Sequence, residues 1–166
     1  MGTNSNGQNI LENCDFTLNF GYKNIAALVF ANSLIRGGQW EDNHSAEQSA
    51  GLFVTFSAVE VHDVSFLSTA IEDEAVKNQT LHDSTTFGGF MYISIGAELH
   101  VAGSRFINGI AKSGGAIFAV GEANITIESS EFTQNSALNS GGAIFLSNFR
   151  GVNITKNSVF RDNIVL

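Results

Sequence analysis

The sequence predicts an all-β solenoid, a parallel β-helix in which each coil takes about 26 residues and contributes three short strands. The hexapeptide SGGAIF occurs twice, at Ser113–Phe118 and Ser140–Phe145, with 27 residues between equivalent positions. Tetrapeptides of the form Phe-x-x-Asn recur in step with it, and short segments of alternating apolar residues precede them. Short strands at a fixed period, with no helical pattern between them, indicate a solenoid rather than a sandwich.

One aromatic residue leads each tetrapeptide, and we call these residues the aromatic anchors. FTLN, WEDN, FTQN and FRDN are clear copies of the tetrapeptide, whereas FLST and FING are degenerate. The anchors, at spacings of 24, 26, 40, 26 and 28 residues, are Phe16, Trp40, Phe66, Phe106, Phe132 and Phe160. The 40-residue gap predicts one insertion loop near residues 67–88, so we expect about five to six coils in one domain over residues 1–166.

The repeated residues are those that benefit from stacking. In a parallel β-helix equivalent residues of successive coils become neighbours, about 4.8 Å apart. The anchors are therefore expected to form an aromatic column. The asparagines of the tetrapeptides are expected to form a ladder of stacked amides, made of Asn19, Asn43, Asn135 and Asn163. The glycine pairs suit the turns, and the absence of proline suits strands that all need their N–H groups.

The strand that follows the glycine pair carries the sharpest functional hypothesis. We expect an inward apolar column of Leu28, Leu52, Met91, Ile117 and Ile144. Their neighbours along the chain would then point outward, namely Val29, Phe53, Tyr92, Phe118 and Phe145. Such an outer aromatic stripe predicts a contact surface for another chain or for sugar rings. The alternatives are that the inward and outward assignments are reversed, or that the insertion covers the stripe.

Composition and charge exclude several function classes. The net charge of −8 and the eight scattered basic residues argue against a nucleic-acid partner. No apolar run is long enough to span a membrane, and the N-terminal decapeptide does not have the pattern of a secretory signal. Cys14 is the one cysteine, so we expect an ordinary thiol, with no intrachain disulfide and no zinc site.

An enzymatic reading depends on one small cluster. Glu60 and His62 are expected on the outer face of a strand, beside Asp63, with His100 about one coil later. A solvated strand face explains the same residues, because the repeat places no second acid there. The acidic segment Ile71–Glu74 favours a short surface helix, with no Ca²⁺-loop spacing. We therefore assign no catalytic residue, no metal ligand and no cofactor.

Four Asn-x-Ser/Thr sequons are present. Asn43 belongs to the predicted ladder and is expected to be a poor acceptor. Asn78 lies in the insertion, and Asn124 and Asn153 are expected in equivalent turns before the alternating segments. These three are the candidate glycosylation sites if the protein is secreted by a eukaryotic cell.

The interleaved GGA[ILV] and FxxN tetrapeptides resemble the passenger repeats of chlamydial polymorphic membrane proteins. Similar repeats occur in surface proteins with the pectin-lyase-like right-handed β-helix fold. The resemblance extends from about Asn9 to Asn163. It implies a right-handed β-helix in an extracellular or cell-surface protein with an adhesive role. The chain differs from that family in having no signal peptide and no translocator barrel, which favours a fragment of a longer chain or another protein with the same repeat.

The ends of the solenoid predict self-association. An uncovered coil presents unpaired strand edges, and head-to-tail stacking of copies would extend the helix into a fibre. The sequence thus predicts a non-enzymatic structural or adhesive module, with itself, glycans or a cell-surface protein as partner. The alternatives are a carbohydrate-binding or carbohydrate-cleaving β-helix and the passenger segment of a bacterial autotransporter adhesin.

Overall fold

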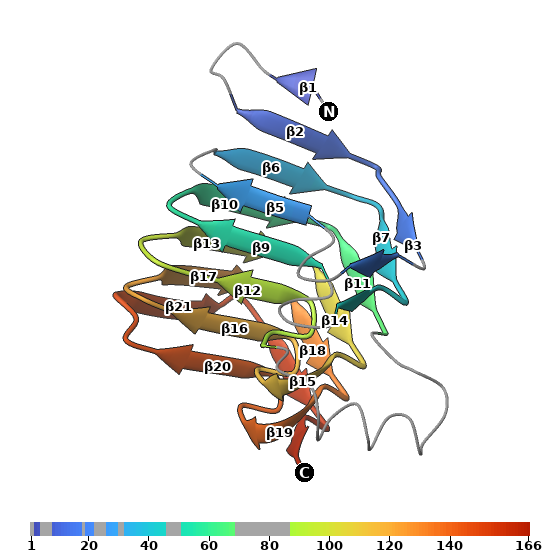
Figure 1. The fold of residues 1–166 in the computed structure, drawn as a ribbon, viewed down its shortest axis with the longest axis vertical. Coiled ribbons are helices and arrows are strands. Elements are labelled where there is room, and N and C mark those ends of the chain that lie inside the picture. The colour runs from blue at the N-terminus through green and yellow to red at the C-terminus, as the bar shows by residue number, and fades with distance from the viewer. Residues whose placement is uncertain are drawn as a thin grey trace.

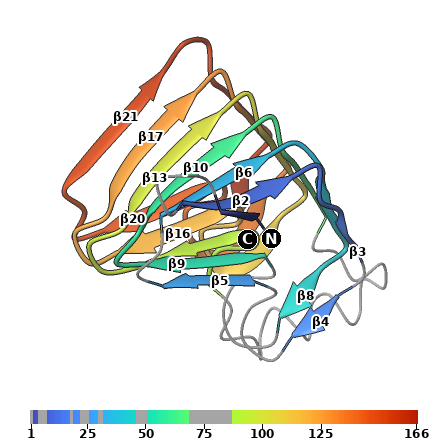
Figure 2. The same ribbon diagram turned by 90° about the horizontal axis from the view of Figure 1, so that it is seen from above.

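A computed structural model describes residues 2–3, 8–17, 19–21, 26–29, 32–45, 51–68 and 87–166. All regular structure in these ranges is β-strand, and they contain no helix that is long and apolar enough to cross a membrane. The chain winds as a right-handed parallel β-helix of triangular outline (Figures 1 and 2). Most of the predicted insertion loop, with the acidic segment and Asn78, lies outside the described residues.

The first sheet holds seven strands and is formed by the alternating apolar segments. Its strands are β1 (Gly2–Thr3), β2 (Asn9–Glu12), β6 (Ser33–Arg36), β10 (Ala58–His62), β13 (Glu98–Ala102), β17 (Asn124–Glu128) and β21 (Gly151–Thr155). The two-residue β1 pairs antiparallel with β2, whereas all the other pairings in this sheet are parallel. Parallel pairing of segments one repeat apart is what the solenoid requires.

The second sheet holds six parallel strands and carries the aromatic anchors. These strands are β3 (Phe16–Thr17), β7 (Gln39–Glu41), β11 (Ser65–Leu67), β14 (Arg105–Ile107), β18 (Glu131–Thr133) and β22 (Val159–Arg161). The third sheet holds five strands, β5 (Ala26–Val29), β9 (Leu52–Thr55), β12 (Met91–Ile93), β16 (Ile117–Val120) and β20 (Ile144–Ser147). These counts agree with the expectation of five to six coils.

Short strands add a fourth segment between the second and third sheets. They are β4 (Phe20–Gly21) with β8 (His44–Ser45), and β15 (Ile110–Ser113) with β19 (Ser136–Ser140) and β23 (Ile164–Val165). The sequence shows no alternation over these two- to five-residue pieces, so they were not predicted as strands. The first five coils thus have the three predicted strands, whereas the last has only its first-sheet and second-sheet strands, and most coils add the short one.

The register confirms that the two SGGAIF copies lie on top of each other. Ile117 pairs with Ile144, and Phe118 pairs with Phe145. The predicted alignment of β5 was wrong by two residues, because Ala26 rather than Leu28 pairs with Leu52. The first two coils lack a recognisable glycine pair, so nothing in the sequence fixed the start of that strand.

Alternation along the strands places one side of every sheet in a shared core. In the third sheet Leu52, Met91 and Ile117 are fully buried, and Ile144 packs against them while remaining partly exposed. The first sheet adds buried aliphatic residues from β6 to β17, which include Ile35, Val61, Val101 and Ile127. Burial of apolar surface in stacked layers is the main favourable term in the folding of such a solenoid.

The aromatic anchors form one continuous column through the core. Ring centroids lie 4.2 Å apart for Phe16 and Trp40, 5.6 Å for Trp40 and Phe66, and 4.8 Å for Phe66 and Phe106. The column continues from Phe106 to Phe132 at 4.5 Å and on to Phe160 at 4.7 Å. The last three rings are almost parallel, with interplanar angles of 4° and 2°. The degenerate copies at Phe66 and Phe106 therefore occupy the same place as the clear ones.

The asparagine ladder joins the coils of Asn43, Asn135 and Asn163 to the coil before each of them. Asn163 Oδ1 accepts hydrogen bonds from the backbone N–H of Asn135 at 3.0 Å and from its Nδ2 at 2.9 Å. Asn163 Nδ2 donates to the carbonyl of Phe132, the anchor of the preceding coil. Asn43 makes the same three bonds to Asn19 and to the carbonyl of Phe16. The ladder satisfies buried backbone groups at the corner, where no strand partner is available.

The ladder is interrupted where the tetrapeptide is degenerate. Gly109 stands at the asparagine position of FING, and its backbone N–H donates to Asn135 Oδ1 at 2.9 Å. Asn135 Nδ2 donates to the carbonyl of Phe106 at 2.9 Å. The backbone N–H of a glycine can therefore donate to the asparagine of the next coil. Glycine has no side-chain amide, however, so it makes no such bond to the coil before it.

A third column lies at the corner between the first and second sheets. Ser130 Oγ accepts from the N–H of Ser104 at 3.2 Å, and Ser158 Oγ accepts from the N–H of Ser130 at 3.4 Å. Each hydroxyl also donates to a carbonyl two or three residues before it. Cys14 takes the serine place in the first coil, because its Sγ donates to the carbonyl of Glu12 at 3.4 Å. The equivalent positions of the second and third coils hold Gly38 and Val64, so the serine column itself begins at Ser104.

The glycine pairs meet two separate steric demands. The first glycine of each SGGAIF copy has a positive φ, 67° at Gly114 and 66° at Gly141. The second glycine lies against the next coil, since a Cβ on Gly115 would lie 2.0 Å from the carbonyl oxygen of Gly142. A side chain at either position would force strain or separate the coils, which explains why both residues are glycine.

We predict that Asn135→Ala destabilises the fold by about 2–4 kcal/mol, because it leaves the buried N–H of Gly109 and the carbonyl of Phe106 without partners. Urea unfolding followed by circular dichroism measures the loss as a lower midpoint at constant slope. Asn139→Ala, at an exposed position of β19, is the matched control and should change stability by less than about 0.5 kcal/mol. Equal effects of the two substitutions would contradict the role of the ladder.

Candidate functional site

The outer face of the third sheet carries a run of aromatic side chains. We call Phe53, Tyr92, Phe118 and Phe145 the aromatic strip. Centroid distances along it are 5.5 Å, 5.2 Å and 5.1 Å, one step for each coil. Ile117 and Ala119, which flank Phe118 along the strand, belong to the core cluster, whereas Phe118 does not. The strip therefore faces outward, as the alternation predicted.

Part of the aromatic strip is covered. Phe87 comes from the end of the predicted insertion loop, and its ring centroid lies 4.7 Å from that of Phe118 and 6.5 Å from that of Tyr92. Phe118 is consequently only 8% exposed, whereas Phe53, Tyr92 and Phe145 are half-buried. Burial raises the pKa of the Tyr92 hydroxyl above its ordinary value. The accessible part of the aromatic strip is thus smaller than predicted. Val29 is not a member, because it pairs with Thr55 rather than with Phe53.

The orientation of the rings limits what the aromatic strip can bind. Phe118 and Phe145 lie almost parallel, with an interplanar angle of 10°, so their faces are turned toward each other. Between these two rings only the edges remain for a partner, whereas the other face of Phe145 has no further ring of the strip against it because β20 is the edge strand of the sheet. A sugar ring that stacks on an aromatic side chain needs the ring face, whereas apolar side chains of a protein can pack against edges. The edges along the strip therefore suit a protein contact, and stacking of a sugar ring is confined to the end of the strip at Phe145.

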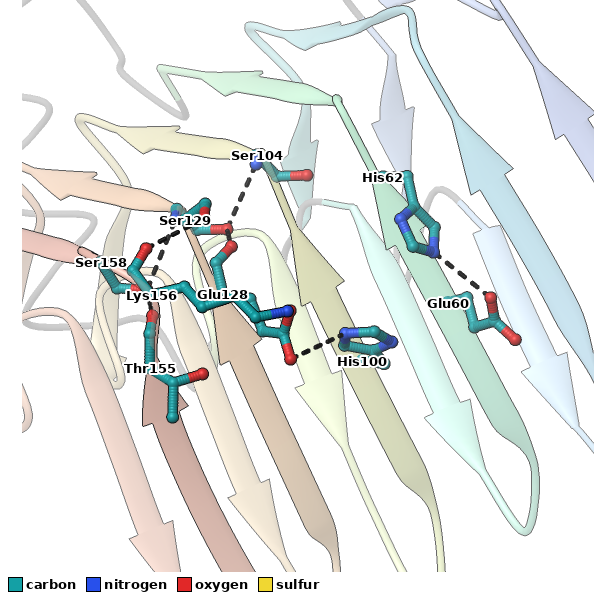
Figure 3. A network of polar contacts seen from close by, with 10 residues as sticks. Glu60, His62, His100, Ser104, Glu128, Ser129, Thr155, Lys156 and Ser158 are labelled. Carbon is teal, nitrogen blue, oxygen red and sulfur yellow. Dashed lines mark hydrogen bonds and ion pairs between the residues drawn. The ribbon is translucent and has the colours of Figure 1, made fainter.

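A second candidate surface lies on the outer face of the first sheet, and we call Glu60, His62, His100, Glu128 and Lys156 the histidine–carboxylate face (Figure 3). His62 Nε2 lies 3.3 Å from Glu60 Oε2 on β10. The rings of His62 and His100 meet edge to face at a centroid distance of 5.5 Å. His100 Nε2 lies 4.0 Å from Glu128 Oε1. Three strands, β10, β13 and β17, and the turn after β21 thus bring together residues that are distant in the sequence.

The electrostatics of this face are those of an ion-pair network. Lys156 Nζ donates a hydrogen bond to Glu128 Oε2, and this bond is the main cause of a lowered pKa of the Glu128 carboxyl. The charges of Lys156, His100 and His62 lower the pKa further. A general acid needs a raised pKa, so Glu128 is suited to remain ionised and to hold Lys156 and His100 in place. The pKa of the Glu131 carboxyl is also lowered, mainly by the hydrogen bond with the Thr133 hydroxyl and to a smaller extent by Arg105.

A shallow groove adjoins the histidine–carboxylate face. It has a volume of about 200 Å³ and is lined by β10, β13 and β17 through residues that include Glu60, Glu98, His100, Asn124 and Thr126. His100 pairs directly with Glu60 across the two strands, as expected for residues about one coil apart. The groove is therefore lined by two carboxylates and an imidazole, which is a chemistry that can hydrogen-bond a polar ligand.

Asp63 does not join this group. It occupies the turn after β10 with a φ of 55°, and its carboxylate lies beside Gly103 of the next coil. Sequence reasoning instead missed Glu128 and Lys156. The signal was available in the strand alignment, because Glu128 stands one coil after Ala102 and on the same face as His100. Among the described residues no three His, Cys, Asp or Glu side chains form a metal-ligand set.

The sequons differ in their accessibility. Asn43 is 3% exposed and its amide is used in the ladder, so it cannot carry a glycan in the folded chain. Asn124 and Asn153 are exposed. The expectation that they occupy equivalent turns is wrong, because both lie within strands and Asn153 pairs with Thr126 while Asn124 pairs with Gly151. Asn78 lies outside the described residues.

Comparison with known proteins adds no relative. No protein-family model, no curated protein and no solved structure matches the chain significantly. The function is therefore argued from the fold and from the two surfaces described above.

We predict that Lys156→Met raises the pKa of Glu128 toward its ordinary value, because the strongest of the interactions that lower it is removed. A carboxyl with a lowered pKa stabilises the fold above its unfolded pKa, and this contribution disappears as pH falls through the folded pKa. Carbon-detected NMR titration of the carboxyl group measures the change. Arg105→Met is the control, since it acts on Glu131. An unchanged Glu128 titration in Lys156→Met would contradict the assignment.

Proposed function

We propose that the chain is a non-enzymatic structural or adhesive module that works at a cell surface or outside the cell. Within the part of the chain that the structure describes, the interior between the sheets is filled by stacked apolar and aromatic side chains. The outer faces are long and regular. A rigid rod with a repetitive outer surface suits contact with another macromolecule better than enclosure of a small molecule.

The observation that carries the proposal is the aromatic strip. Tyr92 and Phe145 keep part of their rings accessible beside the covered Phe118. Aromatic side chains are enriched at the centres of protein interfaces because they bury a large area with little loss of conformational freedom. The partner that this surface fits best is an apolar patch on a cell-surface protein. Glycans are the alternative partner, for which the strip offers an unstacked ring face only at Phe145.

The acidic surface is consistent with a partner that is not a nucleic acid. The net charge is −8, and several of the described basic side chains are already paired with carboxylates, as in Arg36 with Glu12, Arg105 with Glu131 and Arg150 with Glu122. Phosphate contacts need clusters of free cations. Copies of the chain can also be partners for one another, which would make the module a subunit of a fibre.

A second candidate function is the binding or cleavage of a carbohydrate at the histidine–carboxylate face. The observation in its favour is that Glu60 and His100 line a groove, with His62 beside them. Release of reducing ends from a panel of polysaccharides, abolished by His62→Ala, would support it over the first proposal. The third candidate, a passenger segment of a bacterial autotransporter adhesin, is a specific case of the adhesive module and is supported by the repeat resemblance alone.

We predict that the double variant Tyr92→Ser/Phe145→Ser lowers adhesion of protein-coated beads to cultured epithelial cells at least about fivefold, as expected for loss of two interface aromatics. The matched control is Phe56→Ser/Phe149→Ser, since these side chains are 47% and 49% exposed but do not belong to the strip. The control should adhere as the unaltered chain does. Equal adhesion of both double variants, or none by the unaltered chain, would overturn the proposal.

A further inference from the structure

The groove on the outer face of the first sheet lies in the middle coils, between β6 and β21. Every second residue of a strand points outward, and the parallel register sets it beside its equivalent one coil away. The outward residues that line the groove come in pairs from β10, β13 and β17, namely Ala58 and Glu60, Glu98 and His100, and Asn124 and Thr126. The groove is thus built by three successive coils.

The lining of the groove is almost entirely polar. It offers two carboxylates, an imidazole, an amide and a hydroxyl. Val59 and Leu99 also border the groove, but their side chains belong to the core and are at most 2% exposed. Among the described residues of the lining, Ala58 therefore supplies the one apolar side chain that faces a ligand. A ligand that fits this groove is polar on all sides.

The groove carries negative charge that the described residues leave largely uncompensated. Glu98 is exposed and makes no ion pair within the part of the chain that the structure describes. The ion-pair partner of Glu60 in that part is the imidazole of His62, with Nε2 at 3.3 Å from Oε2. Neither carboxylate has a Lys or Arg partner there. A ligand that brings a cation would supply one.

The same face already holds one ammonium group of this chain. Lys156 Nζ donates a hydrogen bond to Glu128 Oε2, and His100 Nε2 lies 4.0 Å from Oε1 of that carboxylate. Figure 3 shows the second ring nitrogen of His100 on the side toward Glu60, the residue with which His100 pairs across the strands. Hydrogen bonds between ammonium and carboxylate groups are about twice as strong as neutral ones. Glu60 and Glu98 offer the same acceptors on the other side of His100.

We propose that this groove binds a sugar with a free amine, that is, a hexosamine unit without an N-acetyl group. The ammonium group lies between Glu98 and Glu60, which are diagonal neighbours on adjacent strands, a separation that long side chains span. The hydroxyls of the sugar ring form hydrogen bonds with His100, Asn124 and Thr126. This inference deepens the second candidate function, carbohydrate binding at the histidine–carboxylate face, and rests on it. It needs neither cleavage nor the aromatic strip.

The polarity of the lining distinguishes an amino sugar from other ligands. A lysine side chain of a partner protein has an apolar stem that packs best on apolar surface, of which the groove offers only Ala58 among its described lining residues. A neutral sugar leaves both carboxylates without a cation, and an acidic sugar is repelled by them. An amino sugar supplies the cation and the hydroxyls together.

Binding of a tetramer of β-1,4-linked glucosamine to the full chain, measured by isothermal titration calorimetry, tests the proposal. The chain is produced in a host that adds no N-glycans, because a glycan on Asn124 would cover the groove. The N-acetylated tetramer should bind at least about tenfold more weakly, since it has no ammonium group. A tetramer of galacturonic acid should bind more weakly still.

One substitution removes a carboxylate from the groove without touching the core. Glu98→Gln should weaken binding of the glucosamine tetramer at least about fivefold, because one charged acceptor becomes neutral. Glu41→Gln is the matched control, since it removes the same charge from β7 of the second sheet, outside the groove. The control should bind as the unaltered chain does.

Each outcome decides the proposal. Weaker binding of the N-acetylated tetramer, together with a loss specific to Glu98→Gln, supports it. Equal affinity for the two tetramers overturns the recognition of an amine while leaving carbohydrate binding at this face. Equal affinities of the two variants overturn the site. Binding of 1,6-diaminohexane as tightly as the glucosamine tetramer overturns the role of the sugar ring, and no binding of any probe overturns the proposal altogether.

The proposals can fail independently of one another. Bead adhesion depends on Tyr92 and Phe145 of the aromatic strip, and release of reducing ends is tested through His62. Neither measurement uses Glu98 or the glucosamine tetramer. Failure of this inference is therefore distinguishable from failure of either function proposed above.

Discussion

The structure depends on the satisfaction of buried backbone groups at the corners of each coil by a side chain from the next coil. Strands supply their own partners through parallel pairing, but corners do not. Asn135 and Asn163 solve the problem at one corner, and Ser104, Ser130 and Ser158 solve it at another. Each of these side chains bonds backbone groups of the coil before it. The hydrogen bonds at the corners of a coil are therefore complete only when another coil lies against it. This is why the same residues recur along the sequence.

The outer surfaces are free of that constraint, and they carry whatever function the chain has. On the first sheet the outward residues differ from coil to coil, and Glu60, His62, His100 and Glu128 form a local network rather than a repeated column. On the third sheet the outward residues are aromatic in four successive strands. Repetition on an outer face is not required for folding in the way that it is at the corners, so it is the stronger indication of a contact surface.

The architecture could be predicted from the sequence because stacking makes structural demands visible as repeats. The anchors and the asparagines of Phe-x-x-Asn lie where the pattern placed them, even in the degenerate coil of Phe106. The register of β5 and the places of Asn124 and Asn153 were wrong, since spacing between 24 and 28 residues leaves a shift of two undetermined. The pairing of Glu128 with Lys156 depends on a contact between coils, for which the sequence of one coil has no signal.

The most direct test of this account is to remove one coil. Deleting residues 117–143 removes one repeat and joins Ala116 to Ile144. Each strand before the deletion can then pair with the equivalent strand after it, in the same register in all three sheets. The account predicts that this shorter chain keeps a β-sheet circular dichroism spectrum and a single cooperative unfolding transition. Deleting residues 117–130 instead joins Ala116 to Glu131, so that a strand of the second sheet follows where a strand of the third sheet is needed. That chain is predicted not to fold cooperatively. Equal behaviour of the two deletions would contradict the claim that coils are held together by identical residues in register.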